Sequence, residues 1–352
     1  MKSIQTEATA SNSAHRRPDE AWLALVQEEV LEPQLAVIDS HHHLWDRPGN
    51  RYLLQEFLDD LACGHDVQAT VHAECGAMYR AKGPREFKPV GETEFINGMA
   101  AIFASGNYGA TRACAGIVGF ADLLLGDRVK GVLEAHIAAG GGRFRGVRNI
   151  AAWHADEAFV RTITIVRAPE RMLEDQTFQA GFRHLAPLGL LFETYLFHTQ
   201  LDDVYALARK FEDTRIVLNF FGGPIKIGPY QGRDEEVFAQ WHAGIRKLAA
   251  CPNVYMKMGG LTIHTSGLNY RDAKTPPSSE QLARPWHAYV DASIAAFGAD
   301  RCFFGTNFPV EKQSCSARVC WNSLKRLAAS CSAQEKVALF TGTATQLYRL
   351  ED

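Results

Sequence analysis

The chain has 352 residues, of which 46% are hydrophobic and 22% are charged, values that are ordinary for a globular protein with a sizeable core. The formal net charge of −3 and the lack of a long Lys or Arg block argue against nucleic acid as a partner. No apolar run approaches the ~20 residues that a membrane span needs, and the first residues lack the apolar segment of a secretory signal. We therefore expect a cytoplasmic protein that binds neither membranes nor nucleic acids.

The eight cysteines are scattered through the chain, with no CxxC pair and no tight spacing of the kind that a disulfide scaffold shows. Cys63, Cys114 and Cys302 lie in apolar runs. We expect free thiols, and in these three positions thiols that pack as small hydrophobic side chains.

The N-terminus differs in composition from the rest of the chain. Residues 1–17 are rich in Ser, Thr and Ala, and we expect them to be mobile. A proline and two acidic residues at 18–20 then open an amphipathic segment that closes at Pro33, which predicts a helix. We therefore divide the chain into an N-terminal extension with an arm helix, residues 1–33, and a main body, residues 34–352.

The main body alternates short apolar runs, typical of strands, with longer amphipathic runs, typical of helices. The expected strands are residues 36–43, 67–74, 114–120, 143–149, 190–195, 215–220, 253–259 and 301–306. The expected helices include residues 92–105, 126–139, 174–186, 201–212, 233–250 and 280–297. Eight such βα units with right-handed crossovers predict an α/β fold, a (β/α)8 TIM barrel that carries the N-terminal helical arm. A doubly wound sheet is the alternative, but it usually has a Gly-rich turn where this chain has histidines.

In a TIM barrel the active site lies at the C-terminal ends of the strands, so polar residues there are candidates. The first strand ends with His41, His42 and His43. Because side chains alternate along a strand, His41 and His43 share one face and His42 points to the other. Two imidazoles on the inner face can bind a divalent metal or donate hydrogen bonds to a substrate carbonyl. A histidine cluster that only packs in the core is the alternative.

Polar and apolar side chains also alternate along the second strand, where Gln68, Thr70, His72 and Glu74 share one face. We assign this face to the lumen, because the Val and Ala side chains of the other face suit the helix-covered outside. His72 and Glu74 then lie near the histidines of the first strand. Either can act as a base, or Glu74 can orient a histidine. A structural carboxylate paired with a nearby Arg is the alternative.

Five further residues are candidates for the active site, four on the predicted strands and one in a connecting segment. Glu193 and Tyr195 share a face of the fifth strand, as a buried carboxylate and a hydrogen-bond donor to an oxyanion. Arg148 at the end of the fourth strand and Lys257 on the seventh are cations that can hold an anionic substrate. Internal salt bridges to the glutamates of the second and fifth strands are the alternative. Tyr79 lies in a long polar segment after the second strand, either a substrate-selecting lid or a solvated connection.

Several motifs occur in an order that is specific for one family. They are DSHHHLWDRPGNRYLLQEF, GHDVQATVHAECGAMYR, FRGVRN, IVLNFFGGP, NVYMKMGGL, FGTNFPVEK and LFTGTATQLYRL. Over residues 18–352 the chain resembles amidohydrolase-related family 2, the lactonase-type branch of the amidohydrolase superfamily, whose relatives include 2-pyrone-4,6-dicarboxylate lactonase and sugar lactonases. The resemblance implies a (β/α)8 barrel and hydrolysis of a C–O or C–N bond, often in a lactone and in many members without an obligatory metal.

The resemblance also assigns roles at three strand ends. His41 and His43 match the HxH of the family's first strand, which binds metal or contacts the substrate carbonyl. The family pattern LNHxGGP has Phe220 in place of its histidine, and the Asp of the eighth strand, a metal ligand and base in many relatives, is Asn307 here. Phenylalanine cannot bind a metal, and an amide cannot take a proton from water near neutral pH, although Asn307 can orient substrate or water. We therefore expect no required cofactor, and a single Zn or Mn ion on His41 and His43 is the alternative.

These observations predict a hydrolase that opens a lactone or related cyclic ester of a small, anionic substrate. One alternative is a nonoxidative metal-dependent decarboxylase of an aromatic or unsaturated carboxylic acid, since related barrels carry that reaction. A non-catalytic ligand-binding barrel is the other, because Phe220 and Asn307 replace two residues of the usual site. The sequence does not identify the substrate, and it leaves open whether the protein forms a homo-oligomer.

Overall fold

The computed structural model describes residues 17–163 and 167–350. Its central sheet consists of eight parallel strands in the order β1 (Ala36–His42), β4 (Asp66–Ala73), β5 (Arg112–Gly119), β6 (Phe144–Ile150), β7 (Leu191–Tyr195), β8 (Ile216–Asn219), β9 (Val254–Gly259) and β10 (Cys302–Gly305). Each strand begins and ends within two residues of its predicted bounds. Sequential parallel neighbours joined by helices are the arrangement expected of a TIM barrel.

The last strand returns beside the first, so the sheet curls into a nearly closed ring. The His43 N–H donates to the Phe308 carbonyl at 2.7 Å, and the Ser40 hydroxyl donates to the Phe304 carbonyl at 2.6 Å. A Cβ atom on Gly305 would lie 2.7 Å from the Ser40 hydroxyl oxygen, so this close approach requires glycine. The (β/α)8 TIM barrel predicted from the sequence is confirmed.

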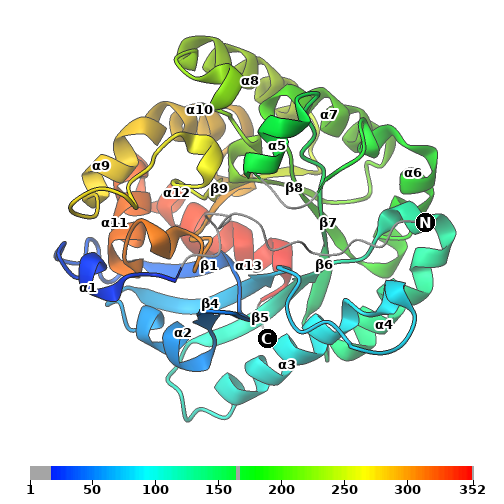
Figure 1. Ribbon diagram of the computed structural model, residues 1–352, viewed down its shortest axis with the longest axis horizontal. Coiled ribbons are helices and arrows are strands. Elements are labelled where there is room, and N and C mark those ends of the chain that lie inside the picture. The colour runs from blue at the N-terminus through cyan, green and yellow to red at the C-terminus, as the bar shows by residue number, and fades with distance from the viewer. Residues whose placement is uncertain (1–16, 164–166, 351–352) are drawn as a thin grey trace.

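Helices surround the strands on the outside of the barrel (Figure 1). They are α2 (Leu54–Leu61), α3 (Val90–Ala104), α4 (Val129–Ala139), α5 (Glu157–Ile163), α6 (Gln176–Phe182), α7 (Leu201–Lys210), α8 (Asp234–Ala249), α9 (Ser279–Ala283), α10 (His287–Phe297), α11 (Ala317–Leu327) and α12 (Ala333–Val337). The predicted helix 280–297 is divided into α9 and α10 around Pro285, whose ring disfavours an uninterrupted helix. A short hairpin of β2 (Trp45–Arg47) and β3 (Asn50–Tyr52) was not predicted.

The C-terminal helix α13 (Thr343–Tyr348) fills one end of the barrel. Its apolar side chains pack against inward side chains of the strands, among them Ile38, Ala69, Val71, Leu191, Val217 and Phe303. This inner core is separate from the larger one between the strands and the surrounding helices. Because apolar side chains close the N-terminal end of the barrel, the polar site lies at the C-terminal end.

The N-terminal arm packs on the barrel, but it is mostly not a helix. Only α1 (Glu20–Leu23) is helical, so the prediction of a helix reaching to Pro33 was wrong. The arm is instead held by tertiary hydrogen bonds: the Glu28 carboxylate accepts from Asn322 Nδ2 at 2.9 Å and from the Ser279 N–H at 2.7 Å. These contacts hold the chain in an irregular path. The predicted mobile segment lies, apart from residue 17, outside the described residues.

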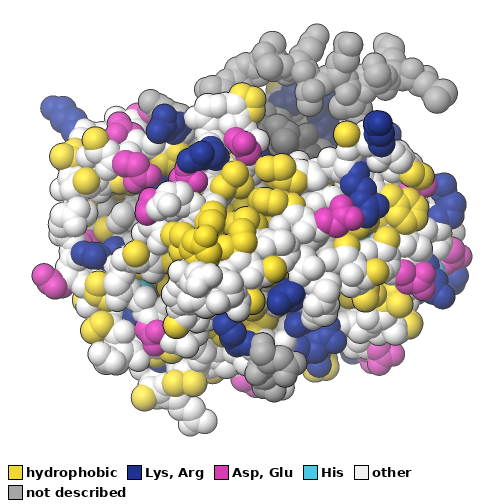
Figure 2. Space-filling model, turned by 90° about the horizontal axis from the view of Figure 1, so that it is seen from below, with side chains coloured by type: hydrophobic (Ala, Val, Ile, Leu, Met, Phe, Trp, Pro, Cys, Tyr) yellow, Lys and Arg dark blue, Asp and Glu magenta, His cyan; other side chains and the backbone are white. Residues whose placement is uncertain are grey.

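The surface and the thiols agree with the composition. All eight cysteines are free, as predicted. On the face shown in Figure 2, basic and acidic side chains are interspersed around a central group of hydrophobic ones, without a field of one sign. Within the described ranges, none of the helices has both the length and the apolar character that crossing a membrane requires.

Candidate active site

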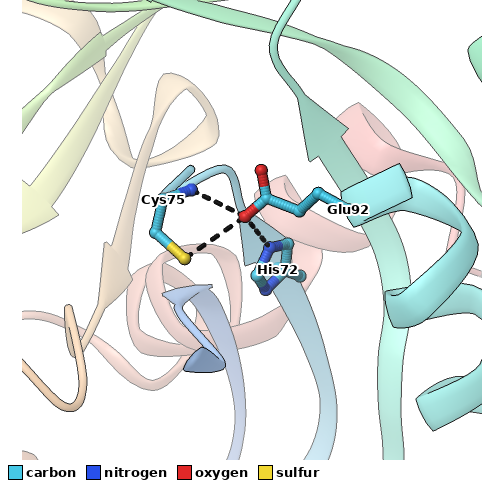
Figure 3. A group of neighbouring side chains, drawn as sticks. All are labelled: His72, Cys75 and Glu92. Carbon is cyan, nitrogen blue, oxygen red and sulfur yellow. Dashed lines mark hydrogen bonds and ion pairs between the residues drawn. The ribbon is translucent and has the colours of Figure 1, made fainter. Parts of the chain in front are cut away.

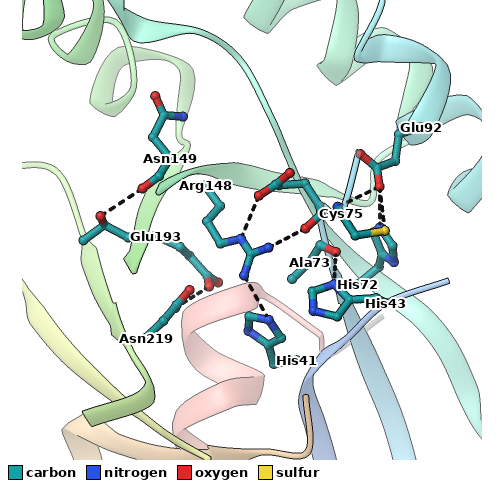
Figure 4. A network of polar contacts seen from close by, with 12 residues as sticks. His41, His43, His72, Ala73, Cys75, Glu92, Arg148, Asn149, Glu193 and Asn219 are labelled. Atoms are coloured by element: carbon teal, nitrogen blue, oxygen red, sulfur yellow. Dashed lines mark hydrogen bonds and ion pairs between the residues drawn. The ribbon is translucent and has the colours of Figure 1, made fainter. Parts of the chain in front are cut away.

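A network of polar side chains occupies the C-terminal end of the barrel, and Arg148 of β6 lies at its centre (Figure 4). Its Nε donates to Glu74 Oε1 at 3.0 Å, its Nη2 donates to the Glu74 carbonyl, and its Nη1 donates to His41 Nε2 at 3.1 Å. Arg148 is 6% exposed and Glu74 is 8% exposed. Arg148 therefore forms an internal salt bridge with Glu74, which the sequence analysis gave as the alternative to binding an anionic substrate. A guanidinium carries five N–H groups, so two remain after these three contacts.

His41 lies between two cations. Arg148 donates to Nε2, and the Lys257 ammonium lies 3.4 Å from Nδ1. Burial, with Lys257 and Arg148 beside the ring, holds the pKa of His41 well below its usual value. The ring is therefore neutral at neutral pH. Phe220, with its ring centroid 4.8 Å from that of His41, covers one side, where the family pattern has a histidine.

His43 is the second inward histidine, and its hydrogen bonds fix its tautomer. Nδ1–H donates to the Ala73 carbonyl at 2.8 Å, so Nε2 carries a lone pair. Asn307 Oδ1 lies 3.2 Å from this nitrogen, and Asn307 Nδ2 donates to Glu311 Oε1 at 3.3 Å. Burial raises the pKa of Glu311 to about 7, although hydrogen bonds from Thr262 and Asn307 act in the opposite direction.

A second layer of charges lies beneath His41, towards α13. Lys257 Nζ contacts Glu193 Oε2 at 2.7 Å, and both side chains are fully buried. Glu193 also accepts from Asn219 Nδ2 at 2.8 Å and from the Tyr348 hydroxyl. The pair matches the internal salt bridge named as the alternative. Lys257 and Glu193 therefore support the floor of the site, and neither is exposed to a substrate.

His42 points away from the lumen, as the alternation predicts. Its ring stacks on Phe57 of α2 with centroids 4.5 Å apart, and its Nε2 contacts the Thr70 hydroxyl at 2.8 Å. The histidine therefore lies in the layer between strands and helices. This confirms the predicted division of the three histidines into an inward pair and one outward side chain.

The predicted orientation of the second strand, β4, was wrong. Val67 pairs with Val37 of β1, but the next pair is Ala69 with Ile38, so β4 has one extra residue, Gln68, at this point. Such a bulge moves every later side chain to the opposite face. Ala69 and Val71 therefore pack inside the barrel.

In consequence, His72 faces the helix layer and lies outside the lumen. Its Nε2 is 3.5 Å from Glu92 Oε1 of α3. Glu74 follows the last residue of the strand and turns back over the lumen to Arg148. Of the two predicted bases on β4, only Glu74 reaches the site.

The two predicted tyrosines lie at the rim. The Tyr195 hydroxyl contacts the Thr265 hydroxyl at 3.1 Å, its ring is 5.9 Å from Phe220, and burial raises its pKa to about 12. Tyr79 is 37% exposed, and Glu92 and Glu74 act with burial to raise its pKa.

Two residues at strand ends have left-handed backbone. Phe220 has φ +50° and Asn307 has φ +61°. Asparagine tolerates this conformation, whereas phenylalanine does so at a cost. Strained backbone of this kind concentrates at functional sites, where the surrounding structure holds it in place. Both positions border His41 or His43.

Sequence reasoning missed four residues of the network: Asn219, Tyr348, Glu311 and Asp39. Asp39 accepts from the Thr306 N–H at 2.9 Å, and burial raises its pKa to about 6. Glu311 and Asp39 stand within the motifs FGTNFPVEK and DSHHHLWD, so carboxylates beside the candidate residues were a usable signal. Asn219 and Tyr348 also stand within the motifs IVLNFFGGP and LFTGTATQLYRL, but they are 26 and 155 residues from their partner Glu193, so nothing local indicates the contact.

Comparison with known proteins agrees with this architecture. The model of the amidohydrolase family matches residues 38–350. An uncharacterised protein of Sinorhizobium fredii is 31% identical over 340 residues, which span 90% of this chain and 99% of that protein. An L-fucono-1,5-lactonase of Burkholderia multivorans is 28% identical over 325 residues, which span 90% of this chain and 96% of that enzyme. The crystal structure of an amidohydrolase from Burkholderia multivorans with bound zinc has a TM-score of 0.66 and 26% identity, over 89% of this chain and 99% of that one. The chain belongs to the amidohydrolase family.

Proposed function

We propose that the protein hydrolyses a lactone or a related cyclic ester of a small molecule. The observation that carries the proposal is the Arg148–Glu74 pair, which places a carboxylate and a guanidinium side by side at the C-terminal end of the barrel. The neutral imidazoles of His41 and His43 line the same place. The likeness to an L-fucono-1,5-lactonase over most of both chains supports the same reaction class.

Glu74 is the general base in this proposal. Burial raises the pKa of its carboxyl, which makes it a stronger proton acceptor than an exposed glutamate. The contact with Arg148 uses Oε1, and 10% of the Glu74 side chain is exposed, which leaves Oε2 for a water molecule. His41 and His43 are weaker bases than ordinary histidines, since burial and the nearby Arg148 lower the pKa of both. Glu311 and Glu193 lie beyond reach, the first behind Asn307 and the second beneath His41.

Arg148 stabilises the oxyanion. Water loses a proton to Glu74, and its oxygen bonds to the lactone carbonyl carbon. The negative charge that forms on the carbonyl oxygen meets the two remaining guanidinium N–H groups. The ring C–O bond then breaks, and the proton passes from Glu74 to the departing alkoxide oxygen. The product is the open hydroxy acid, and Glu74 is again ionised.

The family often uses a metal, and the residues present do not fit one at the HxH position. His41 Nε2 is already occupied by a guanidinium proton, and the Lys257 ammonium lies beside Nδ1. Two positive charges next to the ligand oppose a divalent cation. The histidine and the aspartate that would complete the ligand set are Phe220 and Asn307. We therefore propose that turnover at this site is independent of metal.

The charge pairs also bear on the substrate. An anionic substrate was predicted because Arg148 and Lys257 are cations, but each has a carboxylate partner in the structure. The carboxylates of Glu74 and Glu193 therefore compensate the positive charges of Arg148 and Lys257. We therefore propose an uncharged, hydroxylated lactone as the substrate, with hydroxyl groups that can meet polar side chains such as Tyr195 at the rim.

A substrate panel tests the proposal. Purified protein is mixed with sugar lactones, with a pyrone dicarboxylate and with aromatic carboxylic acids, beside a control without enzyme because lactones also open spontaneously. We expect acid release from uncharged sugar lactones and no carbon dioxide. Carbon dioxide release from an aromatic acid would contradict the proposal in favour of a decarboxylase. Tight binding of a panel member without any turnover would contradict it in favour of a binding protein.

A further inference from the structure

A second group of reactive side chains lies behind the wall of the active site. His72 is on β4, Cys75 follows two residues after that strand, and Glu92 is in the first turn of α3 (Figure 3). The side chains come from three different elements and point towards one another. We propose that His72, Cys75 and Glu92 form a binding site for a thiophilic divalent metal ion of the Zn²⁺ type.

The spacing of the donor atoms suits one ion. One ligand atom from each of the three residues lies within 4.8 Å of the others. Cys75 Sγ is 3.2 Å from Glu92 Oε1, and His72 Nε2 is 3.5 Å from the same oxygen. Around a tetrahedral zinc ion with bonds of about 2.0 to 2.3 Å, neighbouring donor atoms are roughly 3.4 to 3.6 Å apart. Small side-chain rotations therefore bring the three donors to coordinating positions.

Three buried polar atoms of this group lack a hydrogen-bond partner. His72 is fully buried, yet neither Nδ1 nor Nε2 has a hydrogen-bond partner, and Glu92 Oε2 is also buried without one. The buried His136 shows the usual pattern: its Nδ1 contacts the Thr93 hydroxyl and its Nε2 contacts the Phe120 carbonyl. A buried imidazole that makes no hydrogen bond, and only a 3.5 Å contact with Glu92 Oε1, is unfavourable, and a metal ion on one nitrogen removes that cost.

The donor set and its charge select the kind of ion. A thiolate, an imidazole and a carboxylate together are typical ligands of Zn²⁺ and Co²⁺, whereas Mg²⁺ and Ca²⁺ prefer oxygen alone. Binding releases the Cys75 thiol proton to solvent. The thiolate and the Glu92 carboxylate then balance the two charges of the ion, so the buried site is neutral overall. With three protein ligands, a water molecule completes the tetrahedron.

The position of this site gives it a structural role. His72 and Cys75 flank Ala73, whose carbonyl orients His43, and Glu74, which pairs with Arg148. The Cys75 N–H already donates to Glu92 Oε1 at 2.9 Å, which ties this segment to α3. A metal ion would strengthen this connection between the end of β4 and α3. We expect it to stabilise the end of β4 without taking part in the reaction.

Cobalt titration of the full chain tests the proposal without a substrate, so its outcome does not depend on the proposed lactonase reaction. The protein is first freed of metal with a chelator, and Co²⁺ is added under reducing conditions. We expect one Co²⁺ per chain, a near-ultraviolet sulfur-to-cobalt charge-transfer band, displacement by Zn²⁺ and a higher melting temperature. Cys75→Ala and His72→Gln should each lower Co²⁺ affinity by about 100-fold or more.

Two controls make the result specific. Cys331 is also partly buried but lies outside the group, so Cys331→Ala should keep both affinity and band. Circular dichroism of each variant checks that it folds, and Cys75→Ser serves if Cys75→Ala does not fold. The proposal is overturned if Co²⁺ gives no sulfur band, if the band survives Cys75→Ala or Cys75→Ser, or if His41→Ala and His43→Ala abolish binding while His72→Gln retains it.

Discussion

Replacing Lys257 by methionine should destabilise the protein strongly, because it leaves the Glu193 carboxylate buried without its counter-charge. Both side chains are 0% exposed and their charged atoms are 2.7 Å apart. Breaking such a pair by removing one partner typically costs about 3 to 5 kcal/mol. Glu193 keeps hydrogen bonds from Asn219 and Tyr348, so we expect a value near the lower limit. An unfolding entropy of about 2.1 cal/mol/K per residue gives about 0.7 kcal/mol/K for 352 residues, so the melting temperature falls by roughly 4 °C.

Urea unfolding and thermal melting of a double-mutant cycle measure this effect. Glu193→Gln alone leaves a buried ammonium, whereas Lys257→Met with Glu193→Gln removes both charges and should recover most of the loss. Lys247→Met is the matched control, because its ammonium pairs with Asp202 at 2.6 Å on the surface. That variant should change the free energy of unfolding by at most about 1 kcal/mol. A Lys257→Met protein as stable as the control, or a double variant destabilised by the sum of the two single changes, would refute the reasoning.

Three further predictions concern the site. His41→Ala and His43→Ala should each lower turnover by up to about 100-fold, because His41 positions the Arg148 guanidinium and His43 lines the same end of the barrel, while His42→Ala should mainly lower the melting temperature. Equal turnover losses for all three would contradict the inward and outward assignment. Arg148→Lys keeps the charge but loses the planar guanidinium with its five N–H donors, so kcat/KM should fall by at least about 10-fold. Unchanged kinetics in a folded variant would mean that Arg148 serves only the fold. Burial raises the pKa of Glu311 from 4.5 to about 7, so the stability that its protonated form contributes is complete below pH 4.5 and is lost as the pH rises through about 7. Urea unfolding at several pH values should show that Glu311→Gln removes this loss, roughly 3 kcal/mol in size, and an unchanged pH dependence would contradict the buried, protonated carboxyl.

The strands could be predicted from the sequence because apolar runs of strand length alternate with amphipathic runs of helix length, and this pattern reflects burial directly. The same reasoning placed His41 and His43 inside and His42 outside, because side chains alternate over these three consecutive residues, although β1 has a register shift against β4 between Asp39 and His42. It failed on β4, where Gln68 forms a bulge. Periodicity does not reveal a bulge, because an extra residue leaves the alternation of residue types unchanged and reverses only the faces.

The partners of the charged residues could be predicted only as alternatives. The sequence indicates that Arg148 and Lys257 are inward cations, and it allows either an anionic substrate or an internal carboxylate as the partner of each. The choice between these partners depends on distances across the barrel. Tyr348 reaches Glu193 from the C-terminal helix, and no local pattern indicates such a contact. The prediction of a helix in the N-terminal arm failed for a similar reason. Glu28 accepts hydrogen bonds from residues of α9 and α11, and such tertiary contacts leave no local pattern in the sequence.

The kinetics of chelator-treated protein on the best lactone of the panel, wild type beside Glu74→Gln, test the central claim most directly. Glu94→Gln is the control, since this glutamate lies exposed on α3 in a surface pair with Arg80. We expect the metal-free wild type and the control to retain full turnover, and Glu74→Gln to lose about 100-fold to 10,000-fold, the usual contribution of a general base. Loss of wild-type activity on chelation, restored by Zn²⁺ or Mn²⁺, or full activity of Glu74→Gln, would contradict metal-independent hydrolysis with Glu74 as the base.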